Sequence, residues 1–225
     1  MIGQFLEISV QARDIAASAD FWQRAGLRHA AVGDAWTHRY AVLTDGRLVI
    51  GLHDYEFDSP SLTFVKPAVA ESVPALKALG VAFDFEKTGA EQFNEAGFRD
   101  PAGQVVTLLE ARTYSPPWQD GPPGGLFGHF VAYAWPAADL AATIGFWERL
   151  GLVVDRDTRP QRIVAGGITL APGAASEGPT LLFRCPDADA AAAALAGRGL
   201  AARPDPAGGL LLDGPDGIRV RLGPD

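Results

Sequence analysis

The segment EISVQARDIAASADFWQRAGL, from Glu7 to Leu27, contains a complete passage from a strand into a helix. Its first residues alternate between polar and apolar types, as a strand does when one of its faces is buried. Asp14 then stands where a helix N-cap belongs, and Gly26 stands where a helix C-cap ends. The segment therefore predicts one strand followed by one capped helix.

The end of this helix occurs a second time in the chain. FWQRAGL at residues 21–27 is matched by FWERLGL at residues 146–152. The cap residues Asp14 and Asp139 are 125 residues apart, and Gly26 and Gly151 have the same separation. A repeat at fixed spacing indicates a duplicated structural unit. We therefore expect two related halves within the chain of 225 residues.

Each half contains a second, weaker copy of the same order of elements. Three short strand candidates follow Gly26, and the dipeptide Asp45-Gly46 predicts a hairpin between the last two. Another strand at 61–65, a helix ending at Gly80 and three more strands complete the first half. The second half repeats this order with an alanine-rich helix at 187–198. The sequence thus predicts an α+β chain of four strand–helix–strand–strand–strand (βαβββ) units.

A break in composition separates the halves. Residues 112–126, RTYSPPWQDGPPGGL, contain four prolines and three glycines. This composition disfavours the interior of a helix or strand and is typical of a linker. We therefore expect one module at residues 1–111 and a second at residues 127–225.

Charge and composition limit the class of partner. A net charge of −8 and a pI near 5.0 disfavour nucleic acid and anionic membrane surfaces. No stretch approaches a membrane span, and the first residues lack the basic start of a signal peptide. Cys185 is the only cysteine, so no intramolecular disulfide is possible. We expect a cytoplasmic protein with a small-molecule partner.

The order of the units, the capped helices and the turn Asp100-Pro101-Ala102-Gly103 before a final strand resemble the vicinal oxygen chelate superfamily. This superfamily includes glyoxalase I, extradiol dioxygenases and bleomycin-resistance proteins. The resemblance implies two glyoxalase-like modules, each with a cupped mixed sheet, flanking helices and a concave pocket. It also implies a monomer with an internal pseudo-dimer, because two modules in one chain replace the two subunits of single-module relatives.

The same resemblance implies a metal site, which this sequence does not reproduce. Active members hold one divalent metal through two histidines and a glutamate on three strands. The matching positions are Glu7, Ser61 and Thr107 in the first module, and His129, Thr180 and Arg221 in the second. Hydroxyl groups are poor ligands for such metals, and arginine has no lone pair to offer. We therefore expect that the metal triad has been lost and that no cofactor is bound.

Glu7 is the candidate catalytic residue. A carboxylate among apolar neighbours on a central strand is costly unless it is paired or functional. The alternative is a structural ion pair with an arginine such as Arg99 or Arg112.

Further candidates for ligand binding lie on strands with alternating aromatic residues or at the lost metal positions. They are Trp36, His38, Tyr40, Thr107, His129, Tyr133 and Arg221. His38 is alternatively a surface histidine, and the face with Tyr133 is alternatively ordinary core. Arg221 is alternatively on the solvent side of an edge strand. We expect His53 to be a solvated strand end.

Three functions remain open from the sequence. The first is a metal-independent protein that holds a partly aromatic small molecule in a concave pocket. The second is a divalent-metal lyase, isomerase or dioxygenase with unusual ligands such as Glu7, His38 or His129. The third is metal-free acid–base catalysis with Glu7 as the base.

Overall fold

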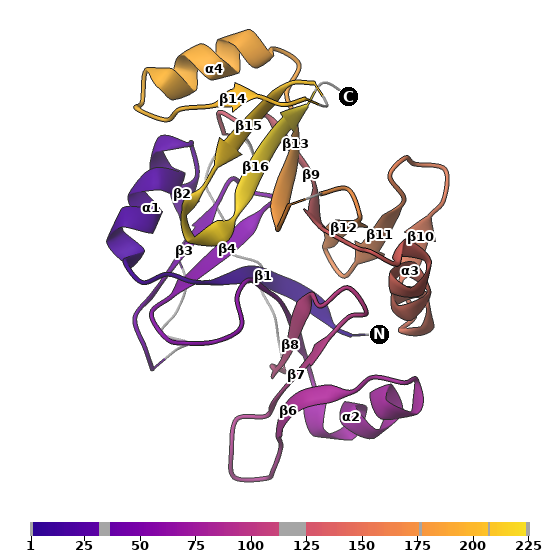
Figure 1. The fold of residues 1–225 in the computed structure, drawn as a ribbon. Helices are drawn as coiled ribbons and strands as arrows, with labels where there is room; N and C mark the ends of the chain where they lie inside the picture. Colours follow the sequence, from indigo (N-terminus) through magenta and orange to yellow (C-terminus); the bar gives the residue numbers. More distant parts are fainter. Residues whose placement is uncertain (1, 32–36, 113–124, 176, 207, 224–225) are drawn as a thin grey trace.

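A computed structural model describes residues 2–31, 37–112, 125–175, 177–206 and 208–223 of the chain. Within these residues the chain folds into two eight-stranded sheets with two α-helices on each (Figure 1). The linker at 112–126 lies outside the described residues except at its ends. Within the described residues, none of the helices has the length and apolar character that crossing a membrane requires.

Module 1 is the first sheet with its helices. Its elements are β1 (Gln4–Gln11), α1 (Ile15–Arg24), β2 (Arg28–His29), β3 (Tyr40–Thr44), β4 (Val49–His53), β5 (Ser61–Lys66), α2 (Val69–Ala78), β6 (Phe83–Lys87), β7 (Glu95–Arg99) and β8 (Val105–Glu110). The strand order is β2-β3-β4-β1-β5-β8-β7-β6, with β1 parallel to β4 and antiparallel to β5.

Module 2 repeats this topology. Its elements are β9 (His129–Trp135), α3 (Leu140–Arg149), β10 (Val153–Asp155), β11 (Arg162–Ala165), β12 (Ile168–Pro172), β13 (Thr180–Arg184), α4 (Ala188–Ala196), β14 (Arg203–Pro204), β15 (Leu210–Asp213), a 3-10 turn η1 (Pro215–Gly217) and β16 (Arg219–Gly223). The strand order, β10-β11-β12-β9-β13-β16-β15-β14, matches that of module 1. The prediction of four βαβββ units in two mixed sheets is confirmed.

The predicted helix caps are confirmed as well. Asp14 Oδ1 accepts a hydrogen bond from the amide of Ala17 at 3.0 Å, and Asp139 Oδ1 accepts one from Ala142 at 2.9 Å. The glycines that follow the two helices have φ angles of 100° and 83°, a region that other residues rarely occupy. The duplicated sequence therefore encodes the same two ends of the helix in each module.

A β-bulge in β1 changes which residues share a face. The pairing with β5 shifts between Phe5 and Glu7, so that Phe5 joins Ile8 in the core. Strict alternation along the strand would place Phe5 on the face of Glu7, and the bulge prevents this. β9 has a matching bulge where it pairs with β13. We call the opposite face of each sheet its cup face; Glu7 and Ser9 lie on that of module 1.

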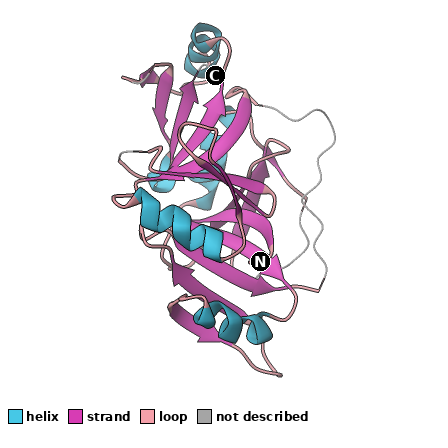
Figure 2. Ribbon diagram, turned by 90° about the vertical axis from the view of Figure 1, so that its right-hand side faces the viewer, coloured by secondary structure: helices cyan, strands magenta, loops and turns pink. Residues whose placement is uncertain are grey.

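Buried side chains from both modules form one continuous apolar core. Polar contacts also cross between the modules. Trp147 Nε1 donates to Asp100 Oδ2 at 3.1 Å, and Ser18 Oγ donates to Asp216 Oδ2 at 2.6 Å. Burial raises the pKa of Asp100, although hydrogen bonds from Gln104 and Trp147 act in the opposite direction. Figure 1 shows α1 beside the end of the β15–β16 hairpin, where η1 lies, and Figure 2 shows the same helices and strands from the side.

The Trp147–Asp100 hydrogen bond yields a test of how the modules hold each other. Trp147→Phe leaves the buried carboxylate of Asp100 without this donor. We expect the free energy of unfolding to fall by about 1–3 kcal/mol, in addition to the packing lost with the smaller side chain. Trp22→Phe is the matched control, because Trp22 occupies the same helix position in module 1 and has no side-chain hydrogen bond within the described residues. Urea unfolding measures both variants. Equal losses of stability would contradict the role of the hydrogen bond.

Candidate functional site

Glu7 is 2 % exposed and lies on the cup face of module 1. Its Oε1 atom is 2.6 Å from His53 Nε2 and accepts a hydrogen bond from Ser9 Oγ at 2.8 Å. The predicted alternative, an ion pair with an arginine, is wrong in its partner. Arg99 instead pairs with Asp58 and Asp84. Glu7 is therefore a paired, buried carboxylate whose partner is a histidine.

His53 is 1 % exposed, so the expectation of a solvated strand end is wrong. It ends β4, which runs parallel to β1, and this pairing carries the imidazole to the carboxylate. Gly51, two residues earlier on the same face, makes room for the pair. A Cβ atom at Gly51 would lie 2.2 Å from the carboxylate carbon of Glu7. In the sequence, the signal for this buried pair was Gly51, a glycine two residues before a histidine at the end of a strand.

A second histidine extends this contact into a chain. His38 Nε2 lies 2.9 Å from His53 Nδ1. Glu7 as a carboxylate can only accept, so the proton between them belongs to His53 Nε2. A neutral His53 then accepts at Nδ1 from His38 Nε2. We call this series of contacts, Glu7–His53–His38, the polar chain.

Burial lowers the pKa of His38, and the nearby His53 lowers it further. His38 precedes β3, which begins at Tyr40, so the expected alternation on one strand does not extend to it. Trp36 lies outside the described residues.

Hydroxyl groups line the cup face around the polar chain. Ser9 Oγ lies 2.6 Å from Thr63 Oγ1, and Ser61 Oγ lies 2.8 Å from Thr107 Oγ1. Since Ser9 gives its single proton to Glu7, Thr63 is the donor in the first pair. These groups and His53 border a cavity of about 30 Å³. That space suits a water molecule and is too small for an aromatic ring.

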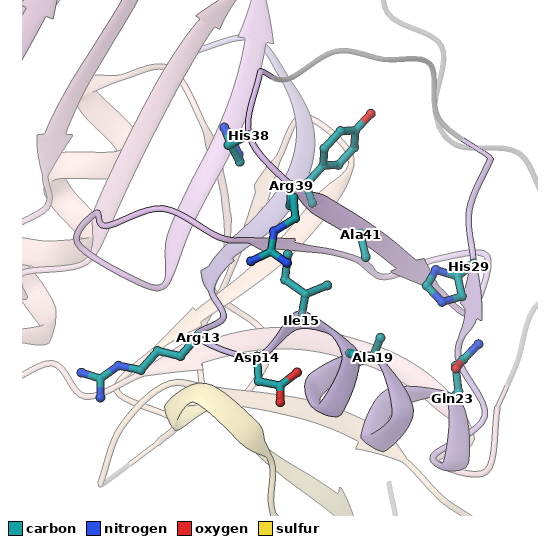
Figure 3. Close-up of a pocket in the computed structure, with 11 residues that line it drawn as sticks. Arg13, Asp14, Ile15, Ala19, Gln23, His29, His38, Arg39 and Ala41 are labelled. Carbon is teal, nitrogen blue, oxygen red and sulfur yellow. The ribbon is translucent and has the colours of Figure 1, made fainter.

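A larger pocket, of about 940 Å³, lies on the other side of His38. His38, Arg39 and Tyr40 line it from one side, and Arg13 and Ile15 line it from the start of α1. Figure 3 shows Arg39 extending from the β3 side toward Ile15. The polar chain thus connects the small cavity, which His53 lines, with a pocket of ligand size.

Aromatic rings surround the two histidines. The rings of His38 and Tyr55 have centroids 4.6 Å apart, and Tyr55 stacks on Phe57 at 4.9 Å. Tyr40 stacks on His53 at 6.3 Å with an interplanar angle of 16°. Tyr55 is 47 % exposed, so part of this aromatic surface faces solvent.

The cup face of module 2 has different chemistry. In module 1, Thr63 on β5 pairs with Glu7 on one side and with Thr107 on the other. In module 2, Leu182 on β13 pairs in the same way with Ala132 and with Arg221. Ala132 is therefore the counterpart of Glu7, and the alignment of His129 with that position is wrong. The spacing of 125 residues between the two modules gives the same counterpart, since residue 132 lies 125 positions after Glu7.

Of the other candidates of module 2, His129 and Arg221 line one pocket, and Tyr133 lies apart from them in the core. Tyr133 is fully buried in the core, where its hydroxyl donates to Gln104 Oε1 at 3.0 Å, and burial raises its pKa. It lines none of the pockets described above. His129 is half-buried against Arg47; burial lowers its pKa, and the charge of Arg47 lowers it further. Arg221 Nε lies 2.5 Å from the buried carboxylate of Asp205.

The side chains of the cup faces do not fit the metal triad of the resembling family. Among the described residues, no three histidine, cysteine, aspartate or glutamate side chains are grouped so that they could hold a metal ion. Glu7 and His38 also approach opposite nitrogens of His53. The imidazole ring therefore separates them, and their donor atoms do not converge on one point.

No family model and no curated protein matches this sequence. Solved structures do match. A catechol 2,3-dioxygenase has a TM-score of 0.58 at 15 % identity, covering 98 % of this chain and 88 % of that one. A homoprotocatechuate 2,3-dioxygenase from Arthrobacter globiformis has a TM-score of 0.58 at 14 % identity, over 98 % and 79 % of the two chains. A Mn(II)-bound glyoxalase from Novosphingobium aromaticivorans has a TM-score of 0.54 at 15 % identity, covering 97 % of this chain and 81 % of that one. At these identities the similarity concerns the fold.

The lowered pKa of His38 makes stability depend on pH in a defined direction. Below the ordinary value of 6.5 the unfolded chain binds a proton that folded His38 resists, so stability falls as pH decreases from 6.5 toward the folded pKa. His38→Asn removes this contribution, and its melting temperature should fall less on acidification than that of the wild type. Thermal melts between pH 7 and about pH 5 measure the difference. His29→Asn, at an exposed histidine, is the control; parallel curves for wild type and His38→Asn would contradict the prediction.

Proposed function

We propose that this chain, which has the vicinal oxygen chelate fold with two βαβββ modules, is a small-molecule binding protein that works without a metal ion. The observation that carries the proposal is the polar chain Glu7–His53–His38. It occupies the cup of module 1 and ends at a pocket of about 940 Å³.

The cost of burying Glu7 supports a role in binding. A buried carboxylate–imidazole pair is seldom more stabilising than apolar residues of the same shape. The Glu7 side chain is nevertheless only 3 % exposed, and that of His53 is only 2 % exposed. Buried ionisable groups paired with each other near a pocket are typical of functional sites.

The surroundings of His38 favour a partly aromatic ligand. Tyr40 lines the same pocket, and Tyr55 provides a partly exposed ring beside His38. Aromatic pairs of this kind add about 0.5–1.5 kcal/mol beyond the burial of their area. The nitrogen atoms of His38 and the guanidinium of Arg13 would orient polar groups on such a ligand.

We also infer that the protein works as a monomer. A molecular mass of a dimer in light scattering would contradict this.

Glu7→Gln separates a binding role from a structural one. The amide oxygen still accepts hydrogen bonds from His53 and Ser9, so the fold should persist. The loss of charge should weaken ligand binding by about 1.5–3 kcal/mol, the scale of a hydrogen bond to a charged group. Calorimetric titration with catechol and related small phenols, after a thermal-shift screen, measures the affinity.

Glu86→Gln is the matched control, because Glu86 pairs with Lys77 at the surface. Undiminished phenol affinity in Glu7→Gln would remove Glu7 from the site. A lower melting temperature with unchanged affinity would assign the Glu7–His53 pair to stability alone.

Metal-free acid–base catalysis is a second candidate, favoured by the order of groups in the polar chain. His53 orients and polarises His38, and Glu7 does the same for His53, as a base and its orienting partners do in known active sites. His53 and His38 are the groups that would act with Glu7 in this candidate function. Chemical conversion of a bound phenol that is lost in both His38→Asn and Glu7→Gln would favour catalysis over binding alone.

A further inference from the structure

The cup face of module 2 borders a pocket of about 660 Å³ that the proposed function does not use. Arg162, Arg184 and Arg221 line this pocket, and none of its described lining residues is an aspartate or glutamate. Three guanidinium groups at one pocket are unexpected in a chain with a net charge of −8. The local charge therefore favours an anion.

The base of the same pocket is apolar. Val131, Ala174 and Leu182 line it and pack on a buried cluster of alanines. Ala132 belongs to that cluster and occupies the position that Glu7 has in module 1. This apolar surface suits a ligand with a hydrocarbon body.

The three arginines differ in how their charge is balanced. Arg221 is fixed by Asp205 at 2.5 Å and by the carbonyl oxygen of Ala174 at 3.2 Å. Arg162 has no ion pair within the described part of the chain. Asp155 lies opposite it in the strand register, but this carboxylate caps a turn by accepting from the amide of Asp157. Arg162 is therefore the guanidinium that most needs an acceptor from a ligand.

We propose that the cup of module 2 is a binding site for a small organic carboxylate. The planar fork of Arg162 matches both oxygens of a carboxylate, while Val131, Ala174 and Leu182 contact its apolar body. Arg184 and the Asp205-bound Arg221 line the same pocket and offer further N–H donors. Inorganic phosphate would satisfy the cations without using the apolar base, so it should bind more weakly. This site and ligand class are independent of the site proposed in module 1.

Calorimetric titration of the full chain with benzoate, benzamide and inorganic phosphate tests this proposal. We expect saturable benzoate binding that weakens as salt is added, and binding of benzamide and phosphate at least about tenfold weaker. Arg162→Gln should weaken benzoate binding by about tenfold or more. Arg156→Gln is the matched control, since Arg156 pairs with Glu148 at the surface outside the pocket.

Ala174→Phe fills the pocket without removing a charge and should also abolish benzoate binding; it decides the matter if Arg162→Gln fails to fold. Glu7→Gln should leave benzoate binding unchanged, so failure here and failure of the site in module 1 are distinguishable. The proposal would be overturned if benzoate did not bind or if phosphate bound as tightly as benzoate. It would also be overturned if Arg162→Gln or Ala174→Phe left the affinity for benzoate unchanged.

Discussion

Module 1 is organised around a carboxylate that has almost no contact with water. Burying an unpaired carboxylate would cost several kcal/mol, so Glu7 requires hydrogen-bond donors from its neighbours. His53 and Ser9 supply them at 2.6 and 2.8 Å. The bulge in β1 turns Glu7 onto the cup face, and the missing side chain at Gly51 leaves the space it fills. The contacts of Glu7 with His53 and Ser9 meet this requirement.

The two modules have the same strands and capped helices but differ in the side chains of their cup faces. The ends of the helices are constrained by backbone geometry. Asp14 and Asp139 accept hydrogen bonds from amides at the helix N-termini, and Gly26 and Gly151 adopt positive φ angles. Positions on the cup faces meet no such requirement. There, module 1 has a carboxylate with hydroxyl groups, and module 2 has methyl groups with arginines. One duplicated scaffold thus supports two pockets of opposite chemical character.

Much of the fold could be predicted from local signals in the sequence. Caps, helix-ending glycines and the repeated helix end require only a few neighbouring residues, and they fixed the order of all four units. The site was harder, because its contacts join distant strands. The pairing of His53 with Glu7 depends on β4 lying parallel to β1, which local periodicity does not reveal. Ala132, in contrast, could have been found from the repeat spacing of 125 residues. The roles of Trp36 and Tyr133 were inferred from alternation alone; Trp36 lies outside the described residues, and Tyr133 is part of the core.

In module 1 we propose that a hydrogen-bonded chain, Glu7–His53–His38, takes the place of a metal site. The most direct test of this proposal is equilibrium dialysis of the purified chain against Mn²⁺, Fe²⁺ and Zn²⁺, followed by elemental analysis. We expect no stoichiometric metal, because Glu7 and His38 lie on opposite sides of His53 and no three potential ligands are grouped among the described residues. About one metal ion per chain, lost in both Glu7→Gln and His53→Asn, would contradict it.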